Sequence, residues 1–153
     1  MTVSAVPAGS IGVSFTPFED RVEVIDAVAA HAEARGLAFV AVAEAMSLAA
    51  PIVLARLAGR TQRIGLMSGV LSVWGRTPAT LALTAAELQR LSAGRFTLGL
   101  GAGTAPITEG FHGQAWTTPV DHLQQTVTAV RALLAAALRM AQRPHQPQHA
   151  ARR

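Results

Sequence analysis

The sequence predicts an α/β fold in which four βα units follow one another and form a parallel sheet. Two observations support this fold class. Four apolar runs rich in branched residues recur along the 153-residue chain, and each is followed by a stretch with helical periodicity. The runs are continuously apolar, which is typical of parallel strands that are buried on both faces. Because strands and helices alternate throughout, a parallel sheet follows.

The strands and helices are expected in regular alternation, with a spacing that suits βα units. The predicted strands cover residues 11–15, 39–43, 64–73 and 96–101. The predicted helices cover residues 19–35, 50–58, 78–91 and 119–140.

Local signals at the ends of the predicted helices agree with this division of the chain. Residues 16–19 (Thr-Pro-Phe-Glu) read as a capping box with proline at the first helical position, and Thr77-Pro78 and Thr118-Pro119 repeat the threonine cap and the proline. Three glycines stand where left-handed C-terminal caps belong: Gly36, Gly59 and Gly94.

Composition excludes several classes of site. Half of the residues are hydrophobic, which is enough for one domain with a core. The chain has no cysteine, so disulfides and thiolate metal sites are excluded, and no spacing of histidines or carboxylates suggests a metal. The formal net charge of +4 comes with acids and arginines mixed on the predicted helices, so we expect no nucleic-acid partner. Without a signal sequence or a membrane span, we expect a soluble cytoplasmic protein.

The chain is expected to have two parts, a domain and a C-terminal tail. Residues 1–140 carry the βα units, whereas residues 141–153 contain two prolines and several arginines and have no apolar periodicity. We therefore expect a disordered basic tail. The alternative is a small basic binding module that takes anions through this tail.

Candidate site residues lie at or after the ends of the predicted strands, where ligands of parallel α/β proteins bind. Glu44 ends the second strand, and Gly69 lies within the third, where glycine indicates a bulge or a close backbone approach. The glycine-rich segment 99–103 follows the fourth strand. It fails the dinucleotide pattern, because position 104 is Thr and no helix is expected at once. This segment either approaches a cofactor or simply forms a tight turn.

Histidines offer one further candidate. His112 lies beside an acid in the long loop before the last helix, where an imidazole could transfer a proton. His31 and His122 fall on helices and are interpreted as surface or capping residues.

Three stretches together resemble the luciferase-like monooxygenase superfamily, in particular its deazaflavin-dependent oxidoreductases. The stretches are 39–45 (Phe-Val-Ala-Val-Ala-Glu-Ala), 63–71 with its continuation 76–79 (Arg-Thr-Pro-Ala), and 91–101 followed by 109–113. The Leu-Ser-x-Gly-Arg entry to the fourth strand and its glycine-rich exit are the most specific of these motifs. The similarity covers about residues 9–135.

The resemblance implies a (β/α)8 barrel, of which this chain would be the N-terminal half, and a cofactor that is either coenzyme F420 or FMN. It implies a cis peptide bond between Gly69 and Val70, flanked by Ser68 and Ser72, against the cofactor ring. Glu44 would lie near the ring edge, and the next position, often histidine in related enzymes, is Ala45 here. The residues expected along the cofactor are Gly101, Ala102, Gly103 and Thr104, and His112 is the candidate on the substrate side.

The chain is short for this architecture, because a complete barrel needs about 250 residues. An open half-barrel would leave its first and fourth strands as unpaired edges.

The resemblance also implies an activity, that of an oxidoreductase acting on a small molecule, either with the deazaflavin or as an FMN-dependent monooxygenase with dioxygen. The alternative is a non-catalytic fragment. A homodimer or a complementary half-barrel would cover the open edges.

Overall fold

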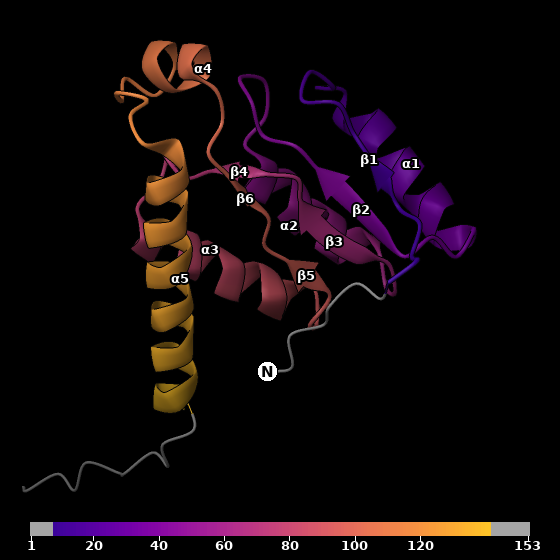
Figure 1. Ribbon diagram of the computed structural model, residues 1–153. Helices are drawn as coiled ribbons and strands as arrows, with labels where there is room; N and C mark the ends of the chain where they lie inside the picture. Colours follow the sequence, from indigo (N-terminus) through magenta and orange to yellow (C-terminus); the bar gives the residue numbers. More distant parts are fainter. Residues whose placement is uncertain (1–7, 142–153) are drawn as a thin grey trace, which may run out of the picture.

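The computed structural model describes residues 8–141 and contains the expected parallel sheet (Figure 1). The main sheet has four strands in the order β1-β2-β3-β5, and every pair is parallel. A second parallel pair, β4 and β6, continues from β3 and β5. The strands are β1 (Val13–Ser14), β2 (Phe39–Val42), β3 (Gly65–Ser68), β4 (Leu71–Ser72), β5 (Phe96–Thr97) and β6 (Leu100–Gly101).

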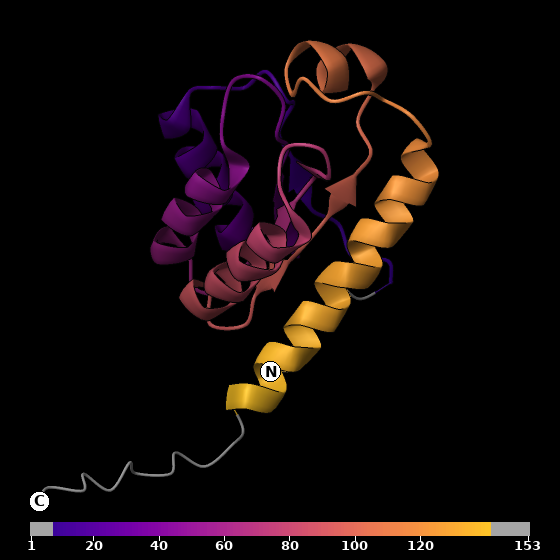
Figure 2. The ribbon, with the colours of Figure 1, turned by 90° about the vertical axis from the view of Figure 1, so that its left-hand side faces the viewer.

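Three helices pack on one face of the main sheet, and the longest helix stands beside its β5–β6 edge, against α3 (Figure 2). A short helix, α4, lies at the end of the molecule where the strands finish (Figure 1). The helices are α1 (Val22–Ala34), α2 (Ala50–Arg60), α3 (Pro78–Leu91), α4 (Ala105–Gly110) and α5 (Pro119–Ala141). Apart from Ala141, which ends α5, the predicted tail lies outside the described residues.

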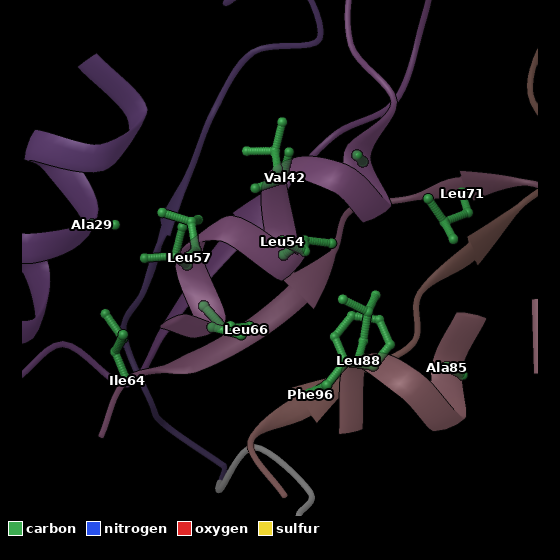
Figure 3. Packing of buried hydrophobic residues seen from close by; sticks show 14 of the residues in the cluster. Ala29, Val42, Leu54, Leu57, Ile64, Leu66, Leu71, Ala85, Leu88 and Phe96 are labelled. Carbon is green, nitrogen blue, oxygen red and sulfur yellow. The ribbon is translucent and has the colours of Figure 1, made fainter. Parts of the chain in front are cut away.

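The core lies between the sheet and helices α1 to α3. Val40 and Val42 of β2, Leu66 of β3 and Phe96 of β5 belong to one buried cluster with residues of these helices (Figure 3). Ala41, which alternates with the two valines, is buried but does not belong to this cluster. Side chains alternate across a strand, so Ala41 marks the face of the sheet that points away from the helices.

Two of the predicted strands are interrupted. The third run forms β3 and β4 with a break at Gly69-Val70, and the fourth forms β5 and β6 with a break at residues 98–99. The first strand is shorter than predicted: β1 covers Val13–Ser14, and Ile11 lies before it with 73% of its surface exposed, although its carbonyl accepts the Ala38 N–H.

The helix termini confirm some of the expected caps and correct others. Thr77 caps α3 by accepting a hydrogen bond from the backbone N–H of Thr80, and Gly36 has the left-handed conformation that follows α1. The capping box at residues 16–19 was wrong, because the Glu19 carboxylate binds Arg21 instead and α1 begins only at Val22. Gly59 was also wrongly placed as a cap. It lies inside α2, which continues to Arg60, whereas Gly94 does adopt a positive φ after α3.

Arg95 explains the Leu-Ser-x-Gly-Arg entry to β5. Its guanidinium donates to the carbonyls at the ends of two helices and of the segment before β3. The acceptors are the backbone oxygens of Ala58, Thr61, Ile64 and Ser92, together with the Thr61 hydroxyl. Helix C-termini carry partial negative charge, so a cation at this point satisfies carbonyls that would otherwise lack partners. Burial lowers the pKa of Arg95, although the side chain stays charged.

Glu33 of α1 also binds the turn between α2 and β3, next to the carbonyls that Arg95 contacts. One carboxylate oxygen accepts the backbone N–H groups of Gln62, Arg63 and Ile64 at 2.8, 2.6 and 3.0 Å. Burial raises the pKa of Glu33, but the three backbone donors and the charge of Arg63 outweigh burial and hold that pKa below its usual value. The charged carboxylate therefore fixes the turn between α2 and β3.

We expect Glu33→Gln to lower the free energy of unfolding by about 1–2 kcal/mol at neutral pH, because the turn loses a charge-assisted acceptor. A carboxyl whose pKa is lowered on folding stabilises the protein above its unfolded pKa, and this contribution disappears as the pH falls through the folded pKa. Urea unfolding of both proteins at pH 7 and in acid should therefore show a difference that shrinks in acid. Glu87→Gln is the control, because Glu87 is 61% exposed and pairs with Arg90 in the next turn. A difference for Glu33→Gln that is constant with pH would contradict this assignment.

Candidate functional site at the carboxyl ends of the strands

All strands of the two sheets are parallel, so the segments that follow them gather at one end of the molecule. These segments, together with α4, lie at the top of Figure 1. The predicted site residues lie at the ends of β3, β4 and β6 or in the segments that follow β2, β3 and β6. Hydrogen bonds join several of these segments.

A pair of hydrogen bonds at this end joins the interruption of the third run to that of the fourth. The Ser68 hydroxyl donates to the Gly99 carbonyl at 2.9 Å and accepts the Gly99 N–H at 2.8 Å. A Cβ on Gly99 would lie 2.1 Å from the Ser68 carbonyl oxygen, so only glycine fits this position. Ser68 is fully buried and uses its hydroxyl in this contact, so it positions the strands from below the surface.

The peptide bond between Gly69 and Val70 is cis, as the resemblance implied. A Cβ on Gly69 would lie 3.2 Å from the Cβ of Ala41, which places Gly69 on the side of the sheet away from the helices. The Val70 side chain is 41% exposed, and a Cβ on Gly101 would lie 2.4 Å from its Cγ2. Val70 is therefore an exposed side chain flanked by two glycines, Gly69 and Gly101, which present only backbone.

Both tryptophans of the chain hold the segment after β6. The indole N–H groups of Trp74 and Trp116 donate to the same carbonyl, that of Ala102, at 2.6 and 3.2 Å. His122 stacks on Trp74 with ring centroids 4.0 Å apart, and its Nε2 lies 3.2 Å from the Val73 carbonyl. The interpretation of His122 as a surface or capping residue was therefore wrong, because the first turn of α5 brings its ring against Trp74. His31 is exposed, as expected.

The segment beyond Ala102 turns into a helix that the sequence analysis did not expect. Gly103 has a positive φ, and α4 begins at Ala105 with proline in its first turn. Thr104 is exposed at the start of this helix but makes no side-chain cap. The side chain of Thr108 is buried beneath Gly103, where its hydroxyl has no hydrogen-bond partner in the described structure.

Glu44 forms a partly buried ion pair with Arg76. The Arg76 guanidinium contacts both carboxylate oxygens, through Nη1 to Oε2 and through Nη2 to Oε1 at 2.8 Å. The same Oε1 accepts the backbone N–H of Ala50 at the start of α2, where a negative charge is favourable. The Glu44 N–H also approaches the Val70 carbonyl at 3.4 Å, which links this pair to the break after β3.

His112 joins Glu44 and Arg76 around a cleft of about 350 Å³. Its ring lies against Gly75, where a Cβ would approach the imidazole to 2.7 Å, and it meets the ring of Phe111 edge-on. The cleft therefore brings an imidazole close to a carboxylate that is already paired with a cation. Such a site can bind a polar group and exchange a proton through the imidazole.

The structure thus brings together most of the predicted residues, but in two groups. Gly69, Val70 and Gly101 form the exposed backbone surface, with Ser72 nearby accepting the Trp74 N–H. Glu44 and His112 belong to the cleft instead. The sequence analysis missed Arg76 and Trp74 as site residues. The position of Arg76 in the sequence was a usable signal. It directly precedes Thr77, the cap of α3, and in parallel α/β folds the N-termini of helices face the ligand.

Residues 8–141 contain neither a cluster of metal-binding side chains nor a membrane-spanning helix. No group of three or more histidine, aspartate or glutamate side chains gathers there in a way that could hold a metal ion. No helix in this part of the chain combines the length and the apolar character needed to cross a membrane.

Comparison with known proteins gives consistent matches. The sequence model of the luciferase-like monooxygenase family matches residues 5–153. A protein of Mycobacterium tuberculosis whose name describes a coenzyme F420-dependent oxidoreductase is 36% identical over 102 residues, which cover 67% of this chain and 29% of that protein.

Two solved structures share the fold. The monooxygenase RslO1 of Streptomyces bottropensis has a TM-score of 0.71 at 24% identity, over 80% of this chain and 42% of that one. The oxygenating constituent of 3,6-diketocamphane monooxygenase from Pseudomonas putida, in complex with FMN, has a TM-score of 0.69 at 20% identity, over 79% and 38%. The chain therefore spans less than half the length of these relatives, and its fold is part of their barrel.

We expect Gly99→Ala to destabilise the protein by about 1–3 kcal/mol or more, because the new methyl group would overlap the Ser68 carbonyl and backbone would have to move. Gly110→Ala is the matched control. Nothing lies within 4 Å of a Cβ at this helical position, so the change should be neutral or slightly stabilising. Urea unfolding of the three proteins measures both effects, and equal midpoints for the two variants would refute the close contact at Gly99.

Proposed function

Because the chain belongs to the luciferase-like monooxygenase family, we propose that it supplies one wall of the cofactor site of an oxidoreductase that uses coenzyme F420 or FMN. The isoalloxazine or deazaflavin ring would lie against Val70 and the backbone of Gly69 and Gly101. The predicted cofactor contacts of Ser72, Ala102, Gly103 and Thr104 would continue this wall along the segment after β6.

The observation that carries the proposal is the exposed surface around Val70. A flat aromatic ring needs an apolar contact without projecting side chains, and Val70 offers one between two glycines. The surface belongs to the face of the sheet away from the helices, which is the inner face when such a sheet is closed into a barrel.

Within residues 8–141, this wall shows no comparable partner for the phosphate end of either cofactor. The two tryptophans hydrogen-bond to the Ala102 carbonyl and Val70 lies beside Gly101, and none of these side chains carries a positive charge. Arg76 is already paired with Glu44. The phosphate contacts would therefore come from the rest of a complete barrel.

The cofactor, when bound, supplies the hydride or oxygen chemistry, and the protein positions it and manages protons. In this chain the proton-transfer candidate is His112. Glu44 would act by positioning, because its carboxylate is engaged by Arg76 and by the start of α2. The substrate would be a small molecule that enters beside the cleft formed by these three residues.

Two forms of the activity are consistent with the relatives. An F420-dependent oxidoreductase fits the name of the Mycobacterium tuberculosis relative, and an FMN-dependent monooxygenase with reduced flavin and dioxygen fits the FMN complex from Pseudomonas putida. A chain that binds neither cofactor in any assembly would instead be a non-catalytic fragment.

We expect the monomeric chain to bind FMN or coenzyme F420 only weakly, with a dissociation constant far above 1 µM, because a tight site buries most of its ligand and this wall covers one side. Calorimetry and cofactor fluorescence at protein concentrations where the chain is monomeric test this. Submicromolar binding by a monomer would show that the remaining walls of a barrel contribute little.

The location of the ring is tested separately by Val70→Asp, which should abolish the residual binding because it places a charge under an apolar ring. Leu83→Asp is the control, since Leu83 is 69% exposed on α3 and lines neither the cleft nor the Val70 surface. Equal cofactor affinity in the two variants would place the ring elsewhere.

A further inference from the structure

The cleft beside the Val70 surface contains a guanidinium with unused hydrogen-bond donors. A guanidinium has five N–H groups, and Arg76 directs two hydrogen bonds to Glu44. Its other donors have no protein acceptor among residues 8–141. The Glu44 carboxylate, in contrast, already accepts from Arg76 and from the backbone N–H of Ala50. The cleft therefore has more free donors than free acceptors, and it suits a ligand that accepts hydrogen bonds.

The charges of Glu44 and Arg76 cancel inside this cleft. Both side chains are largely withdrawn from water, with 10% of Glu44 and 23% of Arg76 exposed. A carboxylate ligand would lose its hydration and would approach the Glu44 carboxylate together with Arg76. A cationic ligand would approach the Arg76 guanidinium in the same way. Because an unbalanced charge is costly where water is displaced, the pair favours an uncharged ligand.

The other wall of the cleft is apolar. Met46 and Phe111 both line it, and they are 59% and 55% exposed. Large apolar side chains that stay open beside a few polar groups are typical of sites for small molecules. The volume of about 350 Å³ is at the small end of such sites. A compact ligand with an apolar body and one accepting oxygen would contact both walls.

We propose that Arg76 is a substrate-binding residue and that the cleft selects a neutral, largely apolar compound whose carbonyl oxygen accepts a hydrogen bond from its guanidinium. Glu44 determines this specificity, because it cancels the charge of Arg76 and leaves N–H donors free. The inference rests on the proposed function for the position of the cofactor. Binding in the cleft can nevertheless be measured with no cofactor present.

The cleft lies next to the surface proposed for the cofactor ring, since the Glu44 N–H is 3.4 Å from the Val70 carbonyl. In the reductive form of the proposed function, a hydride from the reduced deazaflavin would add to the carbonyl carbon, and the C=O electron pair would move to oxygen. Arg76 would stabilise the negative charge that forms there. Protonated His112 would then donate the proton that completes the alcohol. The deazaflavin is thereby oxidised, and the imidazole regains its proton from water.

Three probes of similar shape but different charge test the ligand class on the full-length chain. The ¹⁵N-labelled protein is titrated with cyclohexanone, cyclohexanecarboxylate and cyclohexylamine, and the backbone amide signals of Gly75 and His112 report binding in the cleft. Cyclohexanone should bind most tightly and should shift these signals. Tighter binding of the carboxylate or the amine, or no shift with cyclohexanone up to its solubility limit, would overturn the proposal.

Glu44→Gln tests the role of charge cancellation. The amide carbonyl can still accept a hydrogen bond, but the charge of Arg76 is no longer balanced. The preference should therefore reverse toward cyclohexanecarboxylate, and the ratio of the two affinities should change by about tenfold, as expected for one charge-assisted hydrogen bond. An unchanged preference would contradict the role assigned to Glu44.

Arg76→Met should weaken cyclohexanone binding by about tenfold, because the hydrogen bond to the guanidinium is lost. This variant leaves the Glu44 carboxylate without its cation, so Glu44→Gln/Arg76→Met, which carries neither charge, is measured beside it. Arg90→Met is the control, since Arg90 is 71% exposed, pairs with Glu87 on α3 and lies outside the cleft. Circular dichroism checks that each variant folds. Equal cyclohexanone binding by the double variant and the control would show that Arg76 does not hold the ligand.

The outcome also separates this inference from the proposed function. A chain that binds cyclohexanone through Arg76 but binds neither cofactor in any assembly would refute only the proposed function. A chain that binds a cofactor, but whose cyclohexanone binding does not depend on Arg76, would refute only the inference drawn from the cleft.

Discussion

The close approach of the two interrupted strands at Ser68 and Gly99 is the constraint on which the functional end depends. Because residue 99 is glycine, the two interrupted strands can approach closely. The Ser68 hydroxyl then bonds to the Gly99 backbone in place of regular hydrogen bonds between the strands. This contact sets where Val70 emerges and where Gly101 passes beside it. The segment after β6 then reaches Ala102, whose carbonyl both tryptophans hold. A change at this contact would therefore displace the whole proposed cofactor wall.

A second pair of contacts holds the opposite end of the sheet. Arg95 gathers the carbonyls at the ends of α2 and α3, and Glu33 gathers three N–H groups of the turn before β3. The positive charge of Arg95 satisfies carbonyl acceptors, and the negative charge of Glu33 satisfies N–H donors. Together they fix the turn between α2 and β3. The division is typical of βα folds, in which one end of the strands stabilises the structure and the other carries the site.

The sequence predicted the parallel strand order and the start of α3 well, because these depend on local signals: continuous apolar runs and a threonine cap followed by proline. It failed where a tertiary or competing contact decides the outcome. Glu19 reads as part of a capping box, but Arg21 two residues later provides a stronger, charged partner. His122 reads as a surface residue because nothing local indicates that Trp74, far away in the sequence, will lie against it.

Part of the candidate site could also be predicted from the sequence. Gly69, Val70 and Gly101 were expected from a family resemblance, and the structure places them together. The Glu44–Arg76 pair was not expected, since 32 residues separate the partners and their meeting depends on how the ends of β2 and α3 converge. This pair changes the interpretation of Glu44: its carboxylate is held by a guanidinium and by the start of a helix, which suits it to orienting its neighbours.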